Sequence, residues 1–274
     1  MEILERLFTL KDKSIVITGG GGTLAGTIAK GLAQCGANIV VTDLDETAAQ
    51  KVANEIRKDG NNAVALKVNA INKDDLLAAR EKIVAEFGKI DGLINAVGGN
   101  KKEATTSKEL TFFDIPTEAA KLAFDINFTS IMLACQVFAK EIVKQQNGSI
   151  INISSIAGTR PLTHALMYAA AKAAVNNFTK WLAIDLCQNF STKIRVNAIA
   201  PGFCTTQQNK YLLFNENGEL TERGKTILRV VPQKRFGLPE EFVAAAIWLM
   251  SGSSSFVTGS VVTIDGGFEA FSGV

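Results

Sequence analysis

Histidine and cysteine are scarce in this 274-residue chain, which has one histidine, His164, and four cysteines. The cysteines, at 35, 135, 187 and 204, are widely spaced and form no CxxC pair. Zinc sites are built from clustered cysteine and histidine ligands, so no metal site is predicted. Scattered cysteines without a disulfide framework are typical of reduced thiols, which predicts a cytoplasmic protein.

An excess of charge of one sign is also missing. The chain has 29 basic and 27 acidic residues, a net charge of +2, and no long basic run or interleaving of basic and aromatic residues. Nucleic acid is therefore not an expected partner. The first six residues include the charged Glu2, Glu5 and Arg6 and do not have the pattern of a secretion signal.

Long hydrophobic runs are absent as well. The longest uncharged apolar stretch, around Ile126 to Ala139, is shorter than the roughly 20 residues that a membrane-spanning helix needs, and it contains Asn127 and Gln136. A membrane is therefore not an expected partner. With 47% hydrophobic and 20% charged residues, the composition is that of a globular protein with a sizeable core.

Short β-branched runs alternate with helical patterns along the whole chain. Strands are predicted at residues 14–18, 38–42, 63–68, 92–95, 149–154, 195–200 and 261–264. Helices are predicted near 24–35, 45–58, 72–87, 117–146, 165–190 and 239–250. This alternation predicts an α/β fold, a doubly wound seven-stranded parallel sheet of Rossmann type with helices on both faces. No linker divides the pattern, so residues 1–274 are predicted to form a single domain.

One long polar segment, residues 203–237, follows the sixth predicted strand. The run Asn215-Glu216-Asn217-Gly218 within it predicts a turn. Ligands of doubly wound sheets bind beyond the carboxyl ends of the strands, so this segment is predicted to be a lid over the site.

Tyr168 and Lys172 are four residues apart, and Ser155 lies thirteen residues before the tyrosine. Residues at this spacing share one face of a helix, so the ammonium group can lie beside the phenol. A phenol with a pKa near ~10 is a poor proton donor or acceptor at neutral pH. A charge about 4 Å away at an effective dielectric near 20 is worth ~4 kcal/mol, or roughly three pKa units. We therefore predict that Lys172 lowers the pKa of Tyr168 and makes it a general acid or base.

Four glycines, Gly19 to Gly22, close the first predicted strand and open the first predicted helix. A plain glycine-rich turn is the alternative, but this context predicts a dinucleotide site, because glycines let the backbone approach a pyrophosphate at a helix N-terminus.

Asp43 ends the second predicted strand, 24 residues beyond Gly19, where a carboxylate accepts hydrogen bonds from an adenosine ribose. It would repel a 2′-phosphate, and Leu44 and Asp45 offer no cation to neutralise one, which favours NAD over NADP. The alternative role of Asp43 is to cap the next helix, for which Asp45 is better placed.

These motifs together resemble the short-chain dehydrogenase/reductase family over nearly the whole chain. The resemblance rests on the glycine segment, Leu93–Gly98, Asn127, Ser154-Ser155, Tyr168 with Lys172, and Pro201-Gly202-Phe203 with Thr206. The chain departs from the family pattern at Thr23 and Ala25, where glycine is usual, and at Asn69, where aspartate is usual.

The resemblance implies that Asn127, Ser155, Tyr168 and Lys172 are catalytic. Tyr168 would exchange a proton with the substrate oxygen, Ser155 would hydrogen-bond that oxygen, and Lys172 would also bind the nicotinamide ribose. Asn127 would hold a water that passes protons onward from the lysine. The alternatives are that Ser155 satisfies loop backbone groups and that Asn127 caps or bends a helix. The implied cofactor-binding residues are Gly19, Gly22, Thr23, Leu24, Asp43, Leu44, Asn69, Ala70, Asn95, Tyr168, Lys172, Pro201, Gly202 and Thr206.

Several segments outside the catalytic set resemble the D-mannonate oxidoreductase (fructuronate reductase) branch of that family. They are residues 98–100, 206–209, 213–223, 235–241 and 271–274. The likeness implies reversible NAD-linked reduction of a keto sugar acid, D-fructuronate, to D-mannonate.

The implied substrate residues are Asn100, Ser155, Arg160, His164 and Gln207. We predict that Arg160, together with His164, meets the substrate carboxylate. The alternatives are a surface or intersubunit salt bridge for Arg160 and a solvated loop position for His164.

Other functions stay open at this stage. One is reduction of a different carbonyl substrate, a 3-oxoacyl thioester or a compound of the gluconate or polyol type. Another, outside enzymes, is a catalytically idle NAD-binding regulator. The family resemblance implies a homotetramer built through the helices near 117–146 and 165–190. Cys204, near the nicotinamide-side loop, is predicted to serve packing rather than chemistry.

Overall fold

The computed structural model describes residues 2–206 and 210–273. Its centre is one seven-stranded sheet with strand order β3-β2-β1-β4-β5-β6-β7, in which every neighbouring pair is parallel. The strands are β1 (Ser14–Thr18), β2 (Asn38–Asp43), β3 (Ala63–Lys67), β4 (Gly92–Asn95), β5 (Gly148–Ile153), β6 (Ile194–Pro201) and β7 (Val261–Ile264). The predicted doubly wound fold is confirmed, and each strand end lies within one residue of its predicted position.

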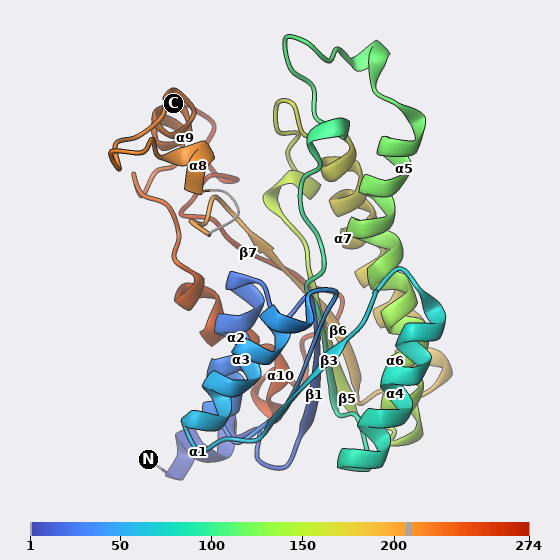
Figure 1. Cartoon of the computed structure of the whole chain (residues 1–274). Helices are drawn as coiled ribbons and strands as arrows, with labels where there is room; N and C mark the ends of the chain where they lie inside the picture. The colour runs from blue at the N-terminus through green and yellow to red at the C-terminus, as the bar shows by residue number, and fades with distance from the viewer. Residues whose placement is uncertain (1, 207–209, 274) are drawn as a thin grey trace.

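Helices cover both faces of this sheet (Figure 1). The α-helices are α1 (Glu2–Phe8), α2 (Thr23–Gln34), α3 (Glu46–Lys58), α4 (Lys73–Phe87), α5 (Thr117–Phe124), α6 (Ser130–Lys144), α7 (Leu166–Asn189), α8 (Lys210–Leu213), α9 (Glu222–Val230) and α10 (Val243–Met250). Helices α2, α3 and α10 lie on one side, and α4, α6 and α7 lie on the other.

The central strands are apolar on both faces because each face meets a helix layer. All five residues of β1 are buried, and so are all six residues of β5. Ile15 and Ile17 pack into the core beneath α2 and α10, whereas Val16 packs into the core beneath α4 and α6. This alternation explains why the strands read as continuous hydrophobic runs.

The helix predicted over residues 117–146 is not a regular α-helix throughout. Helix α5 passes into a π-helical turn, η3 (Asp125–Thr129), before α6 begins. A π turn adds one residue to the helical repeat and rotates the residues that follow it. Asn127 lies on this turn and bonds to the loop after β4, as described below. The helical periodicity of the sequence does not reveal that contact.

The polar segment 203–237 has structure of its own. It contains α8 and α9 within its described part, and the predicted turn is present, with the amide N of Asn215 donating to the carbonyl of Glu219 at 2.8 Å and Gly218 at φ +81°. Leu213, Ile227, Val231 and Phe236 form a small separate hydrophobic cluster, which we call the lid cluster. The lid cluster packs against Phe203, the first residue of the segment, and against Phe268, near the C-terminus.

By length and composition, one helical run of the described residues, Thr117–Lys144, is apolar enough to cross a membrane. The sequence-based prediction counted only the uncharged part of this run and is corrected here. Half of the most apolar stretch is buried in the molecule, and core helices of soluble proteins pass the same test, so the finding is weak support for a membrane span.

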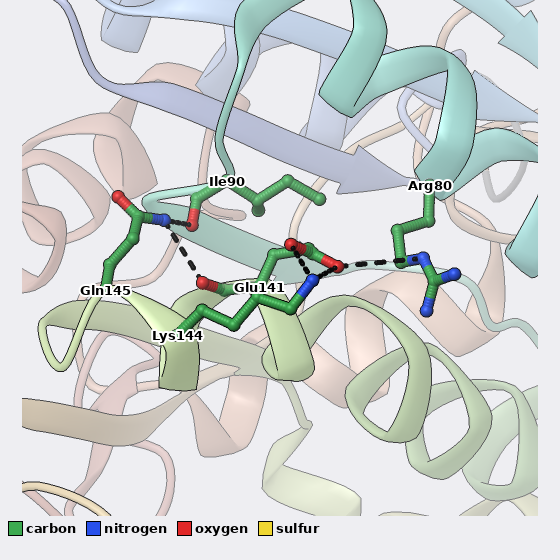
Figure 2. Close-up of polar contacts among 5 residues, drawn as sticks. All are labelled: Arg80, Ile90, Glu141, Lys144 and Gln145. Atoms are coloured by element: carbon green, nitrogen blue, oxygen red, sulfur yellow. Dashed lines mark hydrogen bonds and ion pairs between the residues drawn. The ribbon is translucent and has the colours of Figure 1, made fainter.

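A buried carboxylate joins α4 to α6 (Figure 2). Glu141 accepts two hydrogen bonds of 2.9 Å from the ammonium of Lys144, and its Oε1 lies 3.8 Å from Nε of Arg80. One turn further on, the amide of Gln145 donates to the carbonyl of Ile90 at 2.6 Å. These contacts lie at the amino end of β4, away from the motif residues, and their role is structural.

Candidate active site

The turn after β1 requires glycine. Gly19 has φ +66°, and an added Cβ there would lie 2.9 Å from the amide N of Val97, in the loop after β4. A Cβ on Gly21 would lie 2.7 Å from Cβ of Ala48. Helix α2 begins directly after the turn, and no side chain caps it at Gly22. The first-turn amides of α2, beginning at Thr23 and Leu24, therefore face an anion-binding position with no competing side chain.

Asp43 lies at the end of β2, as predicted, and binds the glycine turn. Its Oδ2 accepts from the amide N of Gly21 at 3.0 Å, and its Oδ1 accepts from the amide N of Asp45 at 3.0 Å. Asp45, not Asp43, caps α3, accepting from the amides of Thr47 and Ala48. The alternative role of Asp43 as a helix cap is therefore wrong.

Next to Asp43, a groove of about 320 Å³ lies between the start of α3 and α4, and its lining includes Leu44 and Asn69. Leu44 is largely exposed, whereas Ala70 is buried. The side-chain oxygen of Asn69 accepts from the amide N of Ile71 at 3.3 Å, so it already shapes this loop. A larger depression of about 570 Å³ along the exposed face of α3 contains none of the predicted site residues and is not the active site.

Tyr168, Ser155 and Lys172 come together at the start of α7. The Ser155 hydroxyl is hydrogen-bonded to Tyr168, and it also accepts from the amide N of Ala157 at 3.1 Å. The ammonium of Lys172 is buried, lies 5.7 Å from the centroid of the Tyr168 ring and donates to the carbonyl of Ile153 at 2.9 Å. The alternative considered for Ser155 was that its hydroxyl only satisfies backbone groups of the loop. That alternative accounts for the bond from Ala157 but not for the contact with Tyr168.

The pKa values at this cluster differ from the prediction. Burial raises the pKa of Tyr168, and the hydrogen bond from Ser155 offsets that rise only in part. Burial also lowers the pKa of Lys172 to about 8. The expectation that the pKa of the phenol is lowered is therefore wrong for this structure, because burial disfavours the phenolate and Lys172 is not among the groups that shift this pKa.

Asn127 lies on the π turn and is fully buried. Its Oδ1 accepts from the amide N of Gly99 at 2.9 Å, and its Nδ2 donates to the carbonyls of Gly99 and Ala123. An added Cβ on Gly98 would lie 2.7 Å from Oδ1 of Asn127 and 3.1 Å from Nζ of Lys172. The loop after β4, the π turn and the lysine therefore meet at one point, and Asn127 fastens that loop by two reciprocal bonds.

Asn95 ends β4 with its side chain turned into the protein. Its Nδ2 donates to Oδ1 of Asn152 at 2.9 Å and to Sγ of Cys135 at 3.2 Å. The side chain of Asn95 is buried, and its hydrogen bonds connect β4 to β5 and α6. Any contact of Asn95 with a cofactor would therefore be made by its backbone.

The end of β6 approaches the C-terminal segment closely. An added Cβ on Gly202 would lie 2.5 Å from Cα of Asp265, so only glycine fits there. Pro201 is the last residue of β6, and Thr206 is partly buried at the end of the loop that follows. Cys204 is buried in this loop, and burial raises the pKa of its thiol to about 12, in keeping with the predicted packing role.

Arg160 holds the C-terminal segment. Its Nη1 donates to the carbonyls of Phe268, Glu269 and Phe271 at 2.9, 3.2 and 3.1 Å. No carboxylate among the described residues lies within ion-pair distance of Arg160, so the surface salt bridge considered above is wrong within the described parts of this chain.

His164 joins the loop before α7 to the loop after β4. Its Nδ1 is 3.1 Å from Oγ1 of Thr106, and its carbonyl accepts from the amide N of Thr106 at 3.1 Å. Its φ of +71° is unusual for a residue other than glycine. Asn100 is exposed in the same loop after β4. Gln207, together with Gln208 and Asn209, lies outside the described residues.

Two residues in this region were missed by the sequence analysis. Thr106 pairs with His164, and Phe268 packs on Arg160 and Phe203. Both pairings join segments that are far apart in the chain, and no local pattern marks them. Phe268 and Phe271 were the only sequence features that could have indicated packing of the C-terminal segment against the site.

The chain was compared with known proteins. A family model described as enoyl-(acyl carrier protein) reductase matches residues 22–269. An uncharacterised oxidoreductase of Haemophilus influenzae is 43% identical, with 97% of this chain and 96% of that protein aligned. An uncharacterised oxidoreductase of Bacillus subtilis is 41% identical, with 97% of this chain and 98% of that protein aligned.

Among solved structures, a Haemophilus influenzae protein provisionally described as a D-mannonate oxidoreductase was crystallised with bound NAD. It matches this chain with a TM-score of 0.93 and 42% identity, covering 99% of this chain and 100% of its own. These matches cover nearly the whole chain. The chain therefore belongs to the short-chain dehydrogenase/reductase family, whose members are oxidoreductases acting on CH–OH groups.

Proposed function

We propose that the protein is an NAD-dependent oxidoreductase that interconverts a keto sugar acid and its hydroxy acid, with D-fructuronate and D-mannonate as the favoured pair. The observation that carries the chemistry is the hydrogen bond between Ser155 and Tyr168 beside the buried ammonium of Lys172. The choice of substrate is supported by the likeness to the Haemophilus influenzae protein described as a D-mannonate oxidoreductase.

The residues at the carboxyl edge of the sheet fit a dinucleotide. The turn at Gly19 leaves no room for a side chain, the N-terminus of α2 has no side-chain cap, and Asp43 ends β2 beside it. We propose that the pyrophosphate meets the turn and the amides of Thr23 and Leu24, and that the adenosine lies near Asp43, Leu44, Asn69 and Ala70. Asp43 would disfavour a 2′-phosphate by charge, which favours NAD.

On the nicotinamide side, we propose that the cofactor meets the backbone of Asn95 and the residues Pro201, Gly202 and Thr206, with Tyr168 and Lys172 at its ribose. When bound, the nicotinamide supplies or accepts the hydride. All other steps belong to the chain's own side chains.

Tyr168 is suited to give a proton to a carbonyl oxygen. Burial raises its pKa, so the phenol holds its proton at neutral pH and can act as the general acid of a reduction. Ser155 would hydrogen-bond the same oxygen and fix its position. Lys172 would then return a proton toward the phenolate, and Asn127 would hold the loop at Gly99 beside it.

The sugar acid would meet Ser155 and Tyr168 at its reacting carbon and Asn100 at its hydroxyl groups. Nη1 of Arg160 donates to three carbonyls, and contact of its other guanidinium nitrogens with the substrate carboxylate stays a prediction. His164 is likewise engaged with Thr106.

The test is a spectrophotometric screen of keto and hydroxy sugar acids with NADH and NAD. We expect D-fructuronate to consume NADH and D-mannonate to reduce NAD, and we expect a Tyr168→Phe control to turn over at least about 10²-fold more slowly. Turnover with NADPH alone would show that the role given to Asp43 is wrong.

A second candidate is reduction of a 3-oxoacyl thioester, which is supported by the 34% identity of this chain to a 3-oxoacyl-[acyl-carrier-protein] reductase of Chlamydia muridarum. Such a substrate brings a long apolar chain, so the same screen includes an acetoacetyl thioester. Activity with the thioester and none with any sugar acid would replace the first candidate by the second.

We further propose a cytoplasmic homotetramer. Trp181 and Ile184 on α7 and Leu122 on α5 are large apolar side chains that stand exposed on the two helices named for the interface. Exposed apolar patches of this kind are typical of contact surfaces.

A further inference from the structure

The C-terminal segment, which we define as residues 265–271, turns back onto the body of the protein after β7. The carboxylate of Asp265 accepts from the amides of Gly267 and Glu269 at 2.8 and 2.6 Å and so shapes the turn. Gly266 has φ +64° and packs against Val231. The segment therefore lies against the lid cluster.

Phe268 connects three parts of the site. Its ring makes an edge contact with Phe203, the residue that follows Gly202, with ring centroids 5.2 Å apart. It also packs against the lid cluster, which includes Ile227 and Val231 of the α9 region. The guanidinium carbon of Arg160 lies 5.5 Å from the centroid of the same ring.

Arg160 belongs to the segment that carries the catalytic serine. A short 3-10 turn, η4 (Ile156–Gly158), follows Ser155, and the amide N of Arg160 donates to the carbonyl of Ile156 at 2.9 Å. A guanidinium has donors in a fixed plane and can stack on an aromatic ring, whereas an ammonium cannot do both. The three carbonyls and the ring of Phe268 use both properties.

We infer that Arg160 is a positioning residue that holds the C-terminal segment and, through Phe268, the lid cluster over the substrate side of the site. The kinetic part of this inference rests on the proposed function. The structural part, a mechanical link between the Ser155 loop and α9, does not.

Loss of the contacts between Arg160 and the C-terminal segment should weaken substrate binding more than it slows the chemical step. Without Arg160, the C-terminal segment and the lid cluster must be ordered when substrate binds, and that ordering reduces affinity. Ser155, Tyr168 and Lys172 keep their own contacts with one another, so the proton transfer is unaffected. The expected signature is a raised KM for the substrate with little change in kcat.

The experiment compares Arg160→Ala, Phe268→Leu and the double variant with Arg6→Ala. Arg6 is an exposed arginine on α1, and its replacement by alanine makes the same change in charge. In Figure 1, α1 lies at the opposite end of the molecule from α9. With D-fructuronate and NADH, we expect KM to rise about tenfold in both single variants, while kcat stays within about threefold. The double variant should resemble the single variants, because both substitutions break one link.

Additive effects in the double variant would overturn the inference, because they would mean that Arg160 acts on the substrate independently of Phe268. A fall in kcat with unchanged KM would overturn it as well. Arg160→Lys should restore little, since lysine cannot bridge the carbonyls and stack on the ring together.

Hydrogen exchange tests the link without any substrate. In Arg160→Ala, amides of residues 222–231 and 265–271 should exchange about tenfold faster than in the wild type, and in Arg6→Ala they should not. Unchanged exchange in both segments would refute the link even if D-fructuronate is a substrate. Faster exchange together with no turnover of D-fructuronate would support the link and reject the substrate.

Discussion

Tyr168 and Lys172 illustrate how burial changes the chemistry of a side chain. Both lie near Ser155 at the start of α7, and burial disfavours the charged form of each. The phenol keeps its proton more firmly, and the ammonium gives its proton up more easily. This pair of shifts favours donation from the phenol followed by resupply from the lysine, which suits a reduction.

Removal of the phenolic oxygen tests this role directly. Tyr168→Phe leaves the ring in place and removes the group that gives the proton, so we expect kcat to fall by about 10²- to 10⁴-fold. NAD affinity, measured by fluorescence titration, should change little. Retention of full turnover would reject Tyr168 as the proton donor. An unaltered biological output in a variant without turnover would favour the idle regulator considered at the outset.

Lys172→Met separates stability from activity. The folded pKa of Lys172 is about 8 and the unfolded value is 10.5, so the unfolded state binds more protons between these values and wild-type stability rises with pH there. Below pH 8, burying the charge costs about 3 kcal/mol, whereas the lost bond to the carbonyl of Ile153 is worth about 1 kcal/mol.

The methionine variant should therefore be inactive yet at least as stable as the wild type at pH 7. Its advantage, measured by urea unfolding, should shrink as the pH is raised from 8 toward 10.5. A variant that is several kcal/mol less stable at pH 7 would contradict the assignment of Lys172 as a buried destabilising cation.

At the scale of elements, the site depends on contacts between segments rather than on any single helix. The π turn η3 aims Asn127 at the loop after β4, where it makes reciprocal bonds with Gly99. The sheet brings two loops of the site together, because the carboxyl ends of β1 and β4 are adjacent and place Gly19 against Val97. Other contacts involve none of the motif residues and are expected to affect stability.

The junction of α4 and α6 provides such a case (Figure 2). Glu141 has a nearly buried side chain paired with Lys144 at 2.9 Å, and Glu118 makes a similar pair with Lys121 at 3.0 Å but is exposed. We expect Glu141→Gln to lower the free energy of unfolding by about 1 kcal/mol and Glu118→Gln to leave it nearly unchanged.

Chemical unfolding monitored by circular dichroism measures both effects. The kinetic constants of both variants should match those of the wild type, because neither carboxylate touches a motif residue. Equal losses of stability from the two substitutions would mean that burial at α6 does not strengthen the pair.

For the whole molecule, the open question is how the exposed apolar side chains of α5 and α7 are covered. Trp181 and Ile184 lie three residues apart and are 58% and 57% exposed. Their spacing places them on one face of α7, where a second copy of the chain would bury them.

Replacing both by aspartate should dissociate the proposed tetramer, because two carboxylates would then have to be buried at the interface. Light scattering after size-exclusion chromatography measures the change in mass. The control is Lys51→Glu on α3, an exposed change of charge away from these helices. A wild-type protein that elutes as a monomer would reject the tetramer itself.

Much of this protein follows from local sequence. The seven strands are short β-branched runs, and burial on both faces makes each recognisable without its neighbours. The spacing of Tyr168 and Lys172, the glycine turn and the acidic end of β2 were equally visible, since each depends on residues that are close along the chain.

The tertiary structure decided what distant segments do to one another. Arg160 binds carbonyls more than a hundred residues away, Asn127 binds a loop through a π turn, and Asn95 turns into the core. The tertiary structure also decided the direction of the pKa shift at Tyr168, because that direction depends on how completely other segments exclude water from the phenol. Periodicity and spacing encode which faces are apolar, but desolvation and long-range pairing exist only once the chain has folded.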